Sequence, residues 1–421
     1  MSLPDDVLIL LQAAGTVASK RGYRLYAVGG FVRDFLLGMP NFDIDLVVEG
    51  SAIAMAMAMA NRFGGEVRGH ARFGTAKWLL EGSSFTSMPS LDFVGARRES
   101  YAHAGALPDV EPGSIEQDLR RRDFSIHTLA ICLDDGRFGQ LLDFFGGVAD
   151  LRTGAIRVLH DLSFVDDPTR MLRAVRYEAR LNFRIEPHSE RLLIDALPLL
   201  PRISGERLTR ELMLTLVEGE PEKALRRLAA LGVLNAIHPG LVFDELTEAR
   251  FGRMRAPRER PGMLDYLALL TLDLPAETIV SLAQRLSLPK ADSEYLAQVS
   301  QAYRILPQLA SDGLSASLVV HLLEPYRSDA LSTVSVLADS PLARARLARY
   351  LSEWCTVKAE LDGNDLRKLG IPPGPVYREI LRSLRDARLD GATSSRAQEE
   401  NMALTLAEQA ARVPIPVEVQ S

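Results

Sequence analysis

One stretch near the N-terminus constrains this chain more than any other: a short apolar strand, a glycine pair, and a second strand that carries two carboxylates. It covers residues 26–48, with Gly29-Gly30 at the turn and Asp43 and Asp45 one residue apart. Side chains alternate along a strand, so both carboxylates point to one face. Like charges repel unless a cation lies between them, and carboxylate oxygens suit Mg²⁺. Because a glycine pair lets backbone N–H groups approach an anion, the stretch predicts a metal-dependent site for a nucleoside triphosphate.

Length, charge and cysteine usage limit the class of protein. The 421 residues suffice for about three domains, and the formal charge of −6 argues against a uniformly basic nucleic-acid coat while allowing a local basic face. Cys132 and Cys355 lack metal-binding spacing, and we interpret both as reduced packing residues. The N-terminus has acids where a signal peptide has bases, and the apolar run 7–11 is too short to span a bilayer. We therefore expect a soluble cytoplasmic protein with no membrane segment.

The order of predicted elements separates a small α/β part from a long helical part. Besides the stretch 26–48, the expected elements of the first part are helices over 6–21 and 51–60 and strands near 66–69, 75–81 and 90–96. A strong amphipathic helix is expected over 167–183 and another from Ser204. From Asp166 onward no strand pattern is evident, and helical patterns continue to about Ala411. The pattern predicts an α/β catalytic head followed by a helical body.

Two further groups would complete a nucleotide site. Asp92 lies in the third short strand, where it would add to the carboxylate cluster that holds two metal ions about 4 Å apart. The alternative for this residue is an acid on an edge strand. The run Arg121-Arg122-Asp123 would grip the ribose hydroxyls or phosphates of a nucleotide, or form a solvated charge cluster at a helix end.

A predicted helix start carries Asp166-Asp167-Pro168-Thr169-Arg170. Proline suits the first helical turn, and an acid before it suits the cap and the macrodipole. Asp167 and Arg170 are three apart and hence neighbours on one helical face, so a surface ion pair worth about 0.3–0.5 kcal/mol is one interpretation. The other is a protein template for a base edge, in which the carboxylate accepts from an exocyclic amino group and the guanidinium donates to the adjacent ring nitrogen. C and A present that pattern and U and G the reverse, so a fixed pair would accept only C and A.

These motifs, in this order, resemble those of the class II tRNA nucleotidyltransferases, the CCA-adding enzymes, whose wider family includes bacterial poly(A) polymerases. Gly29-Gly30-Phe31-Val32-Arg33-Asp34 with Asp43 and Asp45 resembles the catalytic motif, Arg121-Arg122-Asp123 the ribose motif, and Asp166-Asp167-Pro168-Thr169-Arg170 the Glu-Asp-x-x-Arg templating motif. Asp143, Gly146-Gly147 and Asp150-Leu151 resemble the hinge motif, and Ser204-Gly205-Glu206-Arg207 with Glu211 resembles the motif that supports the templating helix. The resemblance covers the ordered motifs of about the first 215 residues.

The resemblance implies an α+β fold with a small mixed-sheet, polymerase-β-like nucleotidyltransferase head, followed by an all-α neck, body and tail. We place the catalytic head at 1–157, the neck with the templating motif at 158–238, and the tRNA-binding body and tail at 239–421. The implied reaction adds C and/or A to the 3′ end of tRNA from CTP and ATP, depends on Mg²⁺ and releases pyrophosphate.

The same resemblance implies roles for individual residues. The expected catalytic residues are Asp43, Asp45 and Asp92, of which the first two are the expected Mg²⁺ ligands. The expected nucleotide and triphosphate ligands are Gly29, Gly30, Arg33, Arg121, Arg122 and Asp123, and the base-templating residues are Asp166, Asp167 and Arg170. Arg173, Arg176 and Arg180 are expected to contact tRNA, and Arg250, Arg253, Arg255, Arg258 and Arg260 form either a second basic track or a solvated helix face.

Three departures from the family pattern stand out. Asp166 stands where Glu is usual, which keeps the charge and shortens the reach. His127 and Thr128 replace the usual Asn-Ala, and we interpret His127 as a local packing or hydrogen-bonding variant rather than a catalytic base. No appended histidine–aspartate hydrolase domain is evident, because the dipeptide His160-Asp161 lacks further histidine ligands.

Several alternatives remain open at this point. Within the family they are addition of CC only, of A only, or of a poly(A) tail; the connection 101–118 is not truncated, which favours full CCA addition. One alternative outside the family is nucleotidyl transfer to a protein or small molecule, and the template motif argues against it. The other is a non-catalytic tRNA-binding relative, and the presence of Asp43 and Asp45 argues against that. The oligomeric state is not indicated.

Overall fold

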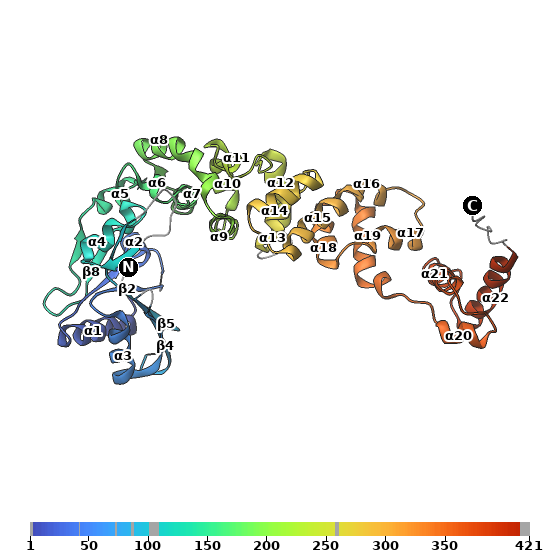
Figure 1. Cartoon of the computed structure of the whole chain (residues 1–421), viewed down its shortest axis with the longest axis horizontal. Helices are drawn as coiled ribbons and strands as arrows, with labels where there is room; N and C mark the ends of the chain where they lie inside the picture. Colours follow the sequence, from blue (N-terminus) through green and yellow to red (C-terminus); the bar gives the residue numbers. More distant parts are fainter. Residues whose placement is uncertain are drawn as a thin grey trace, which may run out of the picture. The chain divides into compact units, whose positions relative to one another are not determined.

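The computed structural model describes residues 3–41, 43–71, 74–85, 88–100, 109–256 and 261–412 (Figure 1). It consists of two compact units, Met1–Val242 and Phe243–Ser421. The predicted mixed-sheet head followed by helices is confirmed, whereas the finer division of the first unit into head and neck stays a prediction. None of the helices in the described ranges has the length and apolar character needed to cross a membrane.

A seven-stranded mixed sheet forms the centre of the first unit, with the strand order β3-β4-β5-β2-β1-β8-β9. Its strands are β1 (Arg24–Val28), β2 (Asp45–Glu49), β3 (Gly64–His70), β4 (Thr75–Ser83), β5 (Ser90–Gly95), β8 (Leu129–Cys132) and β9 (Leu141–Asp143). Strand β2 pairs antiparallel with β1 and parallel with β5, and the parallel register sets Asp45 opposite Asp92. The predicted pairing of the Asp45 strand with the Asp92 strand is therefore confirmed, whereas the prediction that Asp43 lies on the same strand as Asp45 is wrong, because β2 begins only at Asp45.

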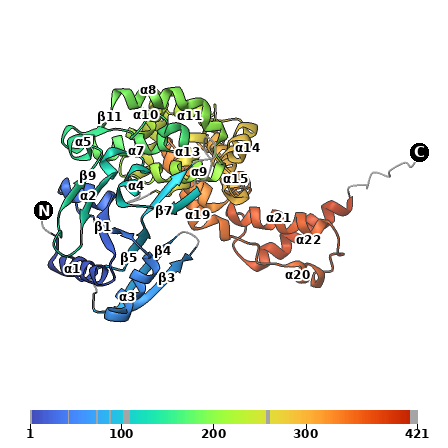
Figure 2. The ribbon, with the colours of Figure 1, turned by 60° about the vertical axis from the view of Figure 1, so that its left-hand side comes forward.

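Helices cover both faces of this sheet. The helices of the head are α1 (Asp5–Lys20), α2 (Gly30–Leu36), α3 (Ala52–Phe63), α4 (Ile115–Arg120) and α5 (Gly147–Thr153). Helix α3 begins after Ser51, whose hydroxyl accepts from the N–H of Ala54 at 3.2 Å, and packs against β3, β4 and β5 (Figure 2). On the other face lies α4, which begins with the predicted Ser114/Gln117 capping box. Its residues Ile115 and Leu119 join a core with Val28 and Val47. That second face also carries Asp45, because residues 45 and 47 alternate with the buried positions 44, 46 and 48.

The rest of the first unit is almost entirely helical. Its helices are α6 (Ser163–Asp166), α7 (Arg170–Leu181), α8 (Pro187–Ala196), α9 (Gly205–Leu216), α10 (Pro221–Ala230) and α11 (Val233–Ile237), with 3₁₀ turns η2 (Ser125–His127) and η3 (Leu197–Arg202). The expectation of no strand after Asp166 is wrong in one place, because β10 (Ala155–Ile156) pairs in parallel with β11 (Arg184–Ile185). Two residues per strand are too few to leave a period-two pattern in the sequence. A further two-stranded ribbon joins β6 (Arg97–Ser100) and β7 (Asp109–Pro112).

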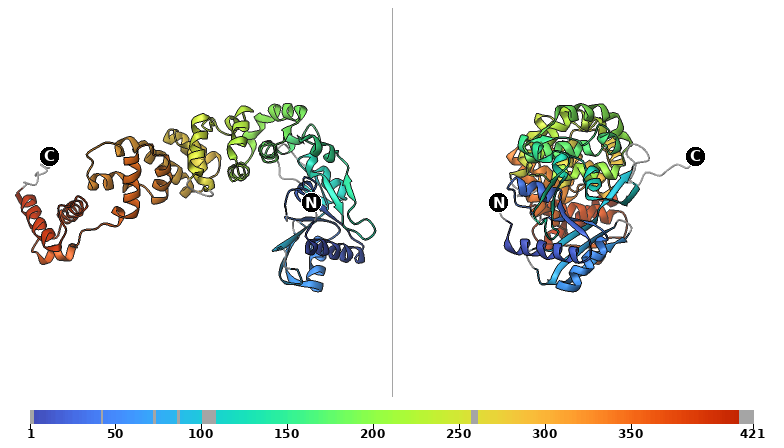
Figure 3. Two further views of the ribbon diagram at one scale, coloured as in Figure 1. Left: turned by 180° about the vertical axis from the view of Figure 1, so that it is seen from behind. Right: turned by 90° about the vertical axis from the view of Figure 1, so that its left-hand side faces the viewer.

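The second unit contains only helices in its described residues. They are α12 (Glu245–Arg255), α13 (Met263–Thr271), α14 (Ala276–Arg285), α15 (Lys290–Arg304), α16 (Leu306–Leu309), α17 (Ala316–Leu323), α18 (Ser328–Leu337), α19 (Pro341–Ser352), α20 (Gly363–Lys368), α21 (Val376–Leu389) and α22 (Arg396–Arg412), with the 3₁₀ turn η4 (Trp354–Thr356). Helices α21 and α22 pack side by side, as the red helices of Figure 3 show, around a core that includes Leu366 and Leu384.

Candidate active site

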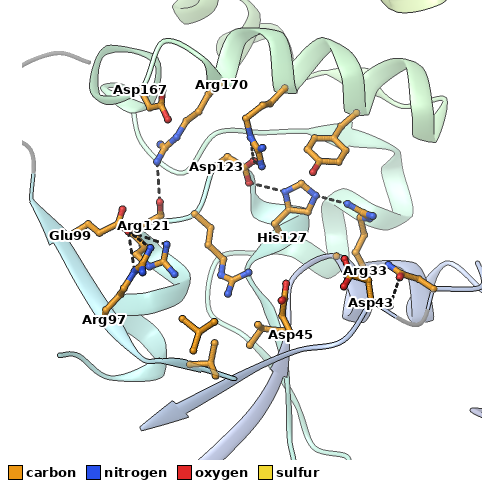
Figure 4. Close-up of a pocket in the computed structure, with 18 of the residues that line it drawn as sticks. Arg33, Asp43, Asp45, Arg97, Glu99, Arg121, Asp123, His127, Asp167 and Arg170 are labelled. Carbon is orange, nitrogen blue, oxygen red and sulfur yellow. Dashed lines mark hydrogen bonds and ion pairs between the residues drawn. The ribbon is translucent and has the colours of Figure 1, made fainter. Parts of the chain in front are cut away.

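A cleft of about 800 Å³ in the first unit brings the sequence motifs together (Figure 4). Its lining combines the glycine turn, the strand carboxylates, the basic run after α4 and the start of α7. The predicted site residues that line it are Gly30, Arg33, Asp43, Asp45, Arg121, Arg122, Asp123, Asp167, Arg170, Arg173 and Arg180. Segments more than a hundred residues apart in sequence thus share one cavity, of a size that suits a nucleotide.

The carboxylates lie at one side of the cleft, at the start of β2. Asp43 is exposed just before the strand, where its N–H donates to Asn41 Oδ1 at 2.9 Å. Partial burial raises the pKa of Asp45, and the charges of Asp43 and Asp92 raise it further, whereas Arg122 lowers it. This mutual repulsion is what a bound cation relieves, and carboxylate oxygens fit Mg²⁺.

Asp92 forms an ion pair with a neighbouring strand. It is the register partner of Asp45, yet its Oδ2 lies 2.9 Å from Lys77 Nζ on β4. Among the described residues no group of three or more histidine, cysteine or acidic side chains converges as a metal site. The site thus offers a pair of carboxylates, Asp43 and Asp45, for a metal ion, and the role of Asp92 stays a prediction.

The glycine turn is shaped to receive an arginine. Gly29 precedes α2 with φ 69° and ψ −129°, and a Cβ atom there would lie 2.5 Å from Arg122 Nη1. Its N–H donates to Leu129 O at 3.1 Å, and the N–H of Gly30 belongs to the first turn of α2, whose N–H groups have no acceptor within the helix. Arg122 Nε is buried with no hydrogen-bond partner, while Nη2 donates to Asp118 Oδ2 at 3.1 Å. A buried unpaired donor beside this turn suits an anionic ligand.

Arg121 is held more tightly than Arg122. Its Nε and Nη2 donate to Asp118 Oδ1 at 3.1 and 2.8 Å, and its Nη1 donates to Glu99 Oε1 at 3.2 Å. Asp118 is completely buried, so it anchors both arginines of the run from inside the protein. The predicted ribose or phosphate contact of Arg121 stays a prediction.

A chain of contacts joins α2 to α7 through His127. Arg33 Nη1 lies 2.6 Å from His127 Nε2, and His127 Nδ1 lies 2.7 Å from Asp123 Oδ1 (Figure 4). Arg173 Nη2 then donates to Asp123 Oδ2 at 2.6 Å. Burial lowers the pKa of His127, against the opposing effect of Asp123. Burial would raise the pKa of Asp123, but its interactions with His127 and Arg173 hold it well below the usual value.

The templating pair does not form the predicted helix-face geometry. Asp167 is extended (φ −137°, ψ 94°) before Pro168, and α7 begins only at Arg170, since a residue that precedes proline avoids the helical region. No ion pair among the described residues joins Asp167 to Arg170, and Arg170 is buried, so the surface-pair interpretation is wrong. Both residues nevertheless line the cleft (Figure 4).

Each member of this pair is fixed by other groups. Asp167 Oδ1 accepts from Arg207 Nη2 and Thr169 Oγ1, both at 2.7 Å. Arg170 Nη1 donates to Ser163 Oγ at 2.6 Å and its Nη2 to Arg121 O at 2.9 Å. Asp166 lines a neighbouring cavity of about 330 Å³ rather than the cleft itself. A templating role for these side chains stays a prediction.

The predicted tRNA-contacting arginines are largely occupied within the protein. Arg176 is buried and donates to Glu211 Oε2 at 3.1 Å, which leaves it unsuited to a phosphate track. Arg180 is half exposed, with Glu218 4.0 Å away. In the second group, Arg250 is buried against Asp273, and Arg253 pairs with Asp339 at 2.8 Å. Arg258, Arg260 and part of the connection 101–118 lie outside the described residues.

The sequence interpretation did not single out Asp118, Glu99 or Tyr177, and it named His127 as a packing or hydrogen-bonding variant without identifying its partners. Asp118 is identifiable in retrospect, because it stands three and four positions before Arg121 and Arg122 in a helix. Glu99, Tyr177 and the bridging position of His127 depend on contacts between distant segments. Tyr177 lies with its ring centroid 4.4 Å from that of His127 and receives the guanidinium of Arg33 on its ring at 5.3 Å.

Comparison with protein-family models matches two regions of the chain. Residues 25–157 match the poly A polymerase head domain, and residues 182–244 match the probable RNA and SrmB- binding site of polymerase A. These matches cover the sheet and the helical region that follows α7, while the cleft residues at the start of α7 and along it lie between the two matched ranges.

Curated relatives extend over most of the chain. An A-adding tRNA nucleotidyltransferase of Geobacter sulfurreducens is 38% identical over 97% of this chain, which spans 48% of that protein. An A-adding tRNA nucleotidyltransferase of Halalkalibacterium halodurans is 35% identical over 90% of this chain and 88% of that protein. A CC-adding tRNA nucleotidyltransferase of Deinococcus radiodurans is 32% identical over the same shares, 90% and 88%.

Solved structures of CCA-adding enzymes are also similar to this chain. A CCA-adding enzyme in apo form superposes with a TM-score of 0.80 at 32% identity, covering 96% of both chains. The Thermotoga maritima CCA-adding enzyme complexed with tRNA gives 0.72 at 32% identity, again with 96% of both chains covered. A complex of a CCA-adding enzyme with ATP gives 0.78 at 31% identity over 97% of both chains.

Proposed function

The chain belongs to the class II tRNA nucleotidyltransferases, which share their head domain with poly(A) polymerases, and we propose that it adds C and/or A of the CCA end to the tRNA 3′ terminus. One observation carries this proposal: the carboxylates Asp43 and Asp45 and the selective residues Asp167 and Arg170 line the same cleft. Addition of A alone is the second candidate, because the relatives at 38% and 35% identity are A-adding enzymes.

The cleft supplies what nucleotidyl transfer requires. Asp43 and Asp45 would hold Mg²⁺, which when bound would activate the 3′-hydroxyl and neutralise charge at the α-phosphate. The 3′-oxygen of the RNA forms the new bond to the α-phosphorus of CTP or ATP, and the bond to pyrophosphate breaks. Arg122, with its unpaired Nε beside the glycine turn, is placed to bind the triphosphate.

Base selection follows from the donors and acceptors that Asp167 and Arg170 keep available. Among the described residues, the hydrogen bonds to Asp167 use Oδ1, which leaves Oδ2 for an exocyclic amino group. Arg170 has committed Nη1 to Ser163 and one Nη2 proton to Arg121, so Nε and a second Nη2 proton remain for a ring acceptor. C and A match this arrangement and U and G oppose it.

The decisive experiment supplies tRNAs that end before CCA, after C and after CC, each with a single labelled nucleoside triphosphate. Full CCA addition extends all three with the correct nucleotide in turn, whereas an A-adding enzyme extends only the tRNA ending in CC. Asp45→Asn should abolish addition, and Asp161→Asn, an exposed connector residue, should preserve it. Full activity of Asp45→Asn would support a different catalytic centre, and no addition by the unaltered protein would refute the proposal.

The choice of base by Asp167 and Arg170 is tested with a separate variant. The double variant Asp167→Ala/Arg170→Ala should flatten the preference for CTP and ATP over UTP and GTP, because it removes both base-edge contacts. Addition rates with the four nucleotides measure that preference, and an unchanged ranking would show that other groups choose the base.

A further inference from the structure

His127 occupies a position that the reaction itself does not explain. Its ring is 5% exposed and lines the cleft between Arg33 of α2 and Asp123 (Figure 4). One ring nitrogen faces the guanidinium of Arg33 at 2.6 Å, and the other faces the carboxylate of Asp123 at 2.7 Å. The imidazole therefore touches a side chain of the glycine-turn helix on one edge and the basic run on the other.

The partners determine the tautomer of the ring. Arginine can only donate hydrogen bonds, so Nε2 must offer a lone pair to Arg33 Nη1. The proton of the neutral ring is then on Nδ1, where it is donated to Asp123 Oδ1. Burial also lowers the pKa of His127, in agreement with a neutral ring. Protonation at Nε2 would remove the acceptor of Arg33 and set two positive charges against each other.

The remaining groups around the ring do not replace this acceptor. From α2, Asp34 Oδ1 receives Arg33 Nε at 2.7 Å and Nη2 at 2.6 Å, which leaves Nη1 for His127. From α7, Arg173 adds positive charge and bonds Asp123, while Tyr177 lies edge-on to the imidazole. The orientation of Arg33 thus depends on His127 at Nη1, and the support of His127 extends through Asp123 to α7.

We propose that His127 is a positioning residue that holds Arg33 at the nucleotide cleft and couples this hold to the templating helix α7 through Asp123 and Arg173, and that it does so only while its imidazole is neutral. The proposal rests on the proposed function insofar as Arg33 contacts the triphosphate of a bound nucleotide. Its consequence is a nucleotide affinity that falls as the ring takes up a proton.

The test is the pH dependence of KM for the added nucleotide, with kcat recorded in parallel. Because burial lowers the pKa of His127, KM of the unaltered protein should begin to rise only below the ordinary imidazole pKa, and should be about tenfold higher once the pH lies well below the lowered pKa, the size expected for loss of a charge-assisted hydrogen bond. Because Arg33 acts on binding, the rise should appear mainly in KM. His188→Gln, on an exposed ring paired with Asp161, is the matched control and should keep the same profile.

Two substitutions separate the two edges of the ring. In His127→Gln the amide oxygen can reach the place of Nε2 and accept from Arg33, so KM should stay near the original value at pH 8 and lose its acid-side rise. In His127→Asn the amide occupies the place of Nδ1, so contact with Asp123 is kept, contact with Arg33 is lost, and KM should be raised about tenfold at every pH. Far-UV circular dichroism establishes that each variant is folded.

The outcomes distinguish this proposal from the proposed function. An acid-side rise that persists in His127→Gln, or an unchanged KM in His127→Asn, would overturn the positioning role. If the unaltered protein adds no nucleotide to any tRNA, the proposed function fails instead. Nitrogen NMR of the imidazole, with the signal identified by its loss in His127→Gln, then still decides the geometry: a proton on Nδ1 supports it and a proton on Nε2 contradicts it.

Discussion

Replacing Gly29 by alanine tests whether the glycine turn exists to admit Arg122. The turn has φ 69° and ψ −129°, outside the regions that L-residues normally occupy. A Cβ atom at this position would meet Arg122 Nη1 at 2.5 Å, so the guanidinium must move by roughly 1 Å to restore ordinary contact. Gly38, which follows the same helix with φ 70° and has nothing within 4 Å of its Cβ position, is the matched control.

The two substitutions should differ both in the property that they change and in the size of the change. Gly38→Ala places alanine in a left-handed conformation and should lower the free energy of unfolding by about 1–2 kcal/mol, with no change in nucleotide binding. Gly29→Ala should cost about 1–3 kcal/mol for backbone strain. It should also raise KM for ATP or CTP about tenfold, because a displaced Arg122 loses its charge-assisted contact with the triphosphate.

Both quantities can be measured on the full chain. The chain has two tryptophans, and in a Trp354→Phe background the fluorescence of the fully buried Trp78 reports unfolding of the unit that contains the sheet. Denaturant unfolding then gives the stability change, and single-nucleotide addition to tRNA gives KM. Equal KM values for Gly29→Ala and Gly38→Ala would refute the inference that Arg122 serves the nucleotide at this turn.

Two other contacts lead to sharp expectations. Asp118→Ala leaves Arg121 and Arg122 without their buried carboxylate and should destabilise the first unit by about 3–5 kcal/mol in the same fluorescence assay. The control, Glu116→Ala, removes an exposed partner of Arg120 and should leave the stability nearly unchanged. Similar stability losses in both variants would contradict the anchoring role of Asp118. Arg207→Gln weakens the hydrogen bond that fixes Asp167 and should reduce discrimination against UTP and GTP about tenfold, measured by competition between nucleotides, without changing the unfolding midpoint. The control, Arg210→Gln, changes an exposed residue of the same helix and should discriminate normally. Retained discrimination in both variants would show that Asp167 needs no support from α9.

The parts predicted well from sequence are those set by local rules. The Ser51 cap and the Ser114/Gln117 capping box are short-range patterns, and the structure confirms both. The strand over residues 43–48 is confirmed only from Asp45 onward, and the alternation of burial stops at Val47, which packs in the core. The start of α7 was misplaced because the preference of a residue before proline outweighed the capping pattern at Asp167. The error did not remove Asp167 from the cleft, because an Asx-type bond to Thr169 holds its side chain there.

The contacts that sequence could not reveal are those between distant segments with no fixed spacing. Arginines at helical spacing, such as Arg176 and Arg250, resemble a phosphate track in sequence, yet burial against acids from other helices uses their charge inside the protein. His127 has one local partner, Asp123 four residues earlier, but its other contacts come from distant segments. Its neighbours are Arg33, which lies 94 residues earlier, and Arg173, reached through Asp123.

The run Arg121-Arg122-Asp123 joins the carboxylate side of the cleft to the α7 side. The backbone carbonyl of Arg121 receives Arg170, and the side chain of Asp123 links Arg173 to His127. Between them Arg122 faces the glycine turn and lowers the pKa of Asp45. Three consecutive residues therefore contact Arg170 of α7, the glycine turn and the bridging histidine. Because each residue of this run contacts a different side of the cleft, the run cannot move toward one side without disturbing the other contacts. We therefore expect substitutions in this run to change base preference and catalytic rate together, and substitutions at other cleft residues to change one without the other.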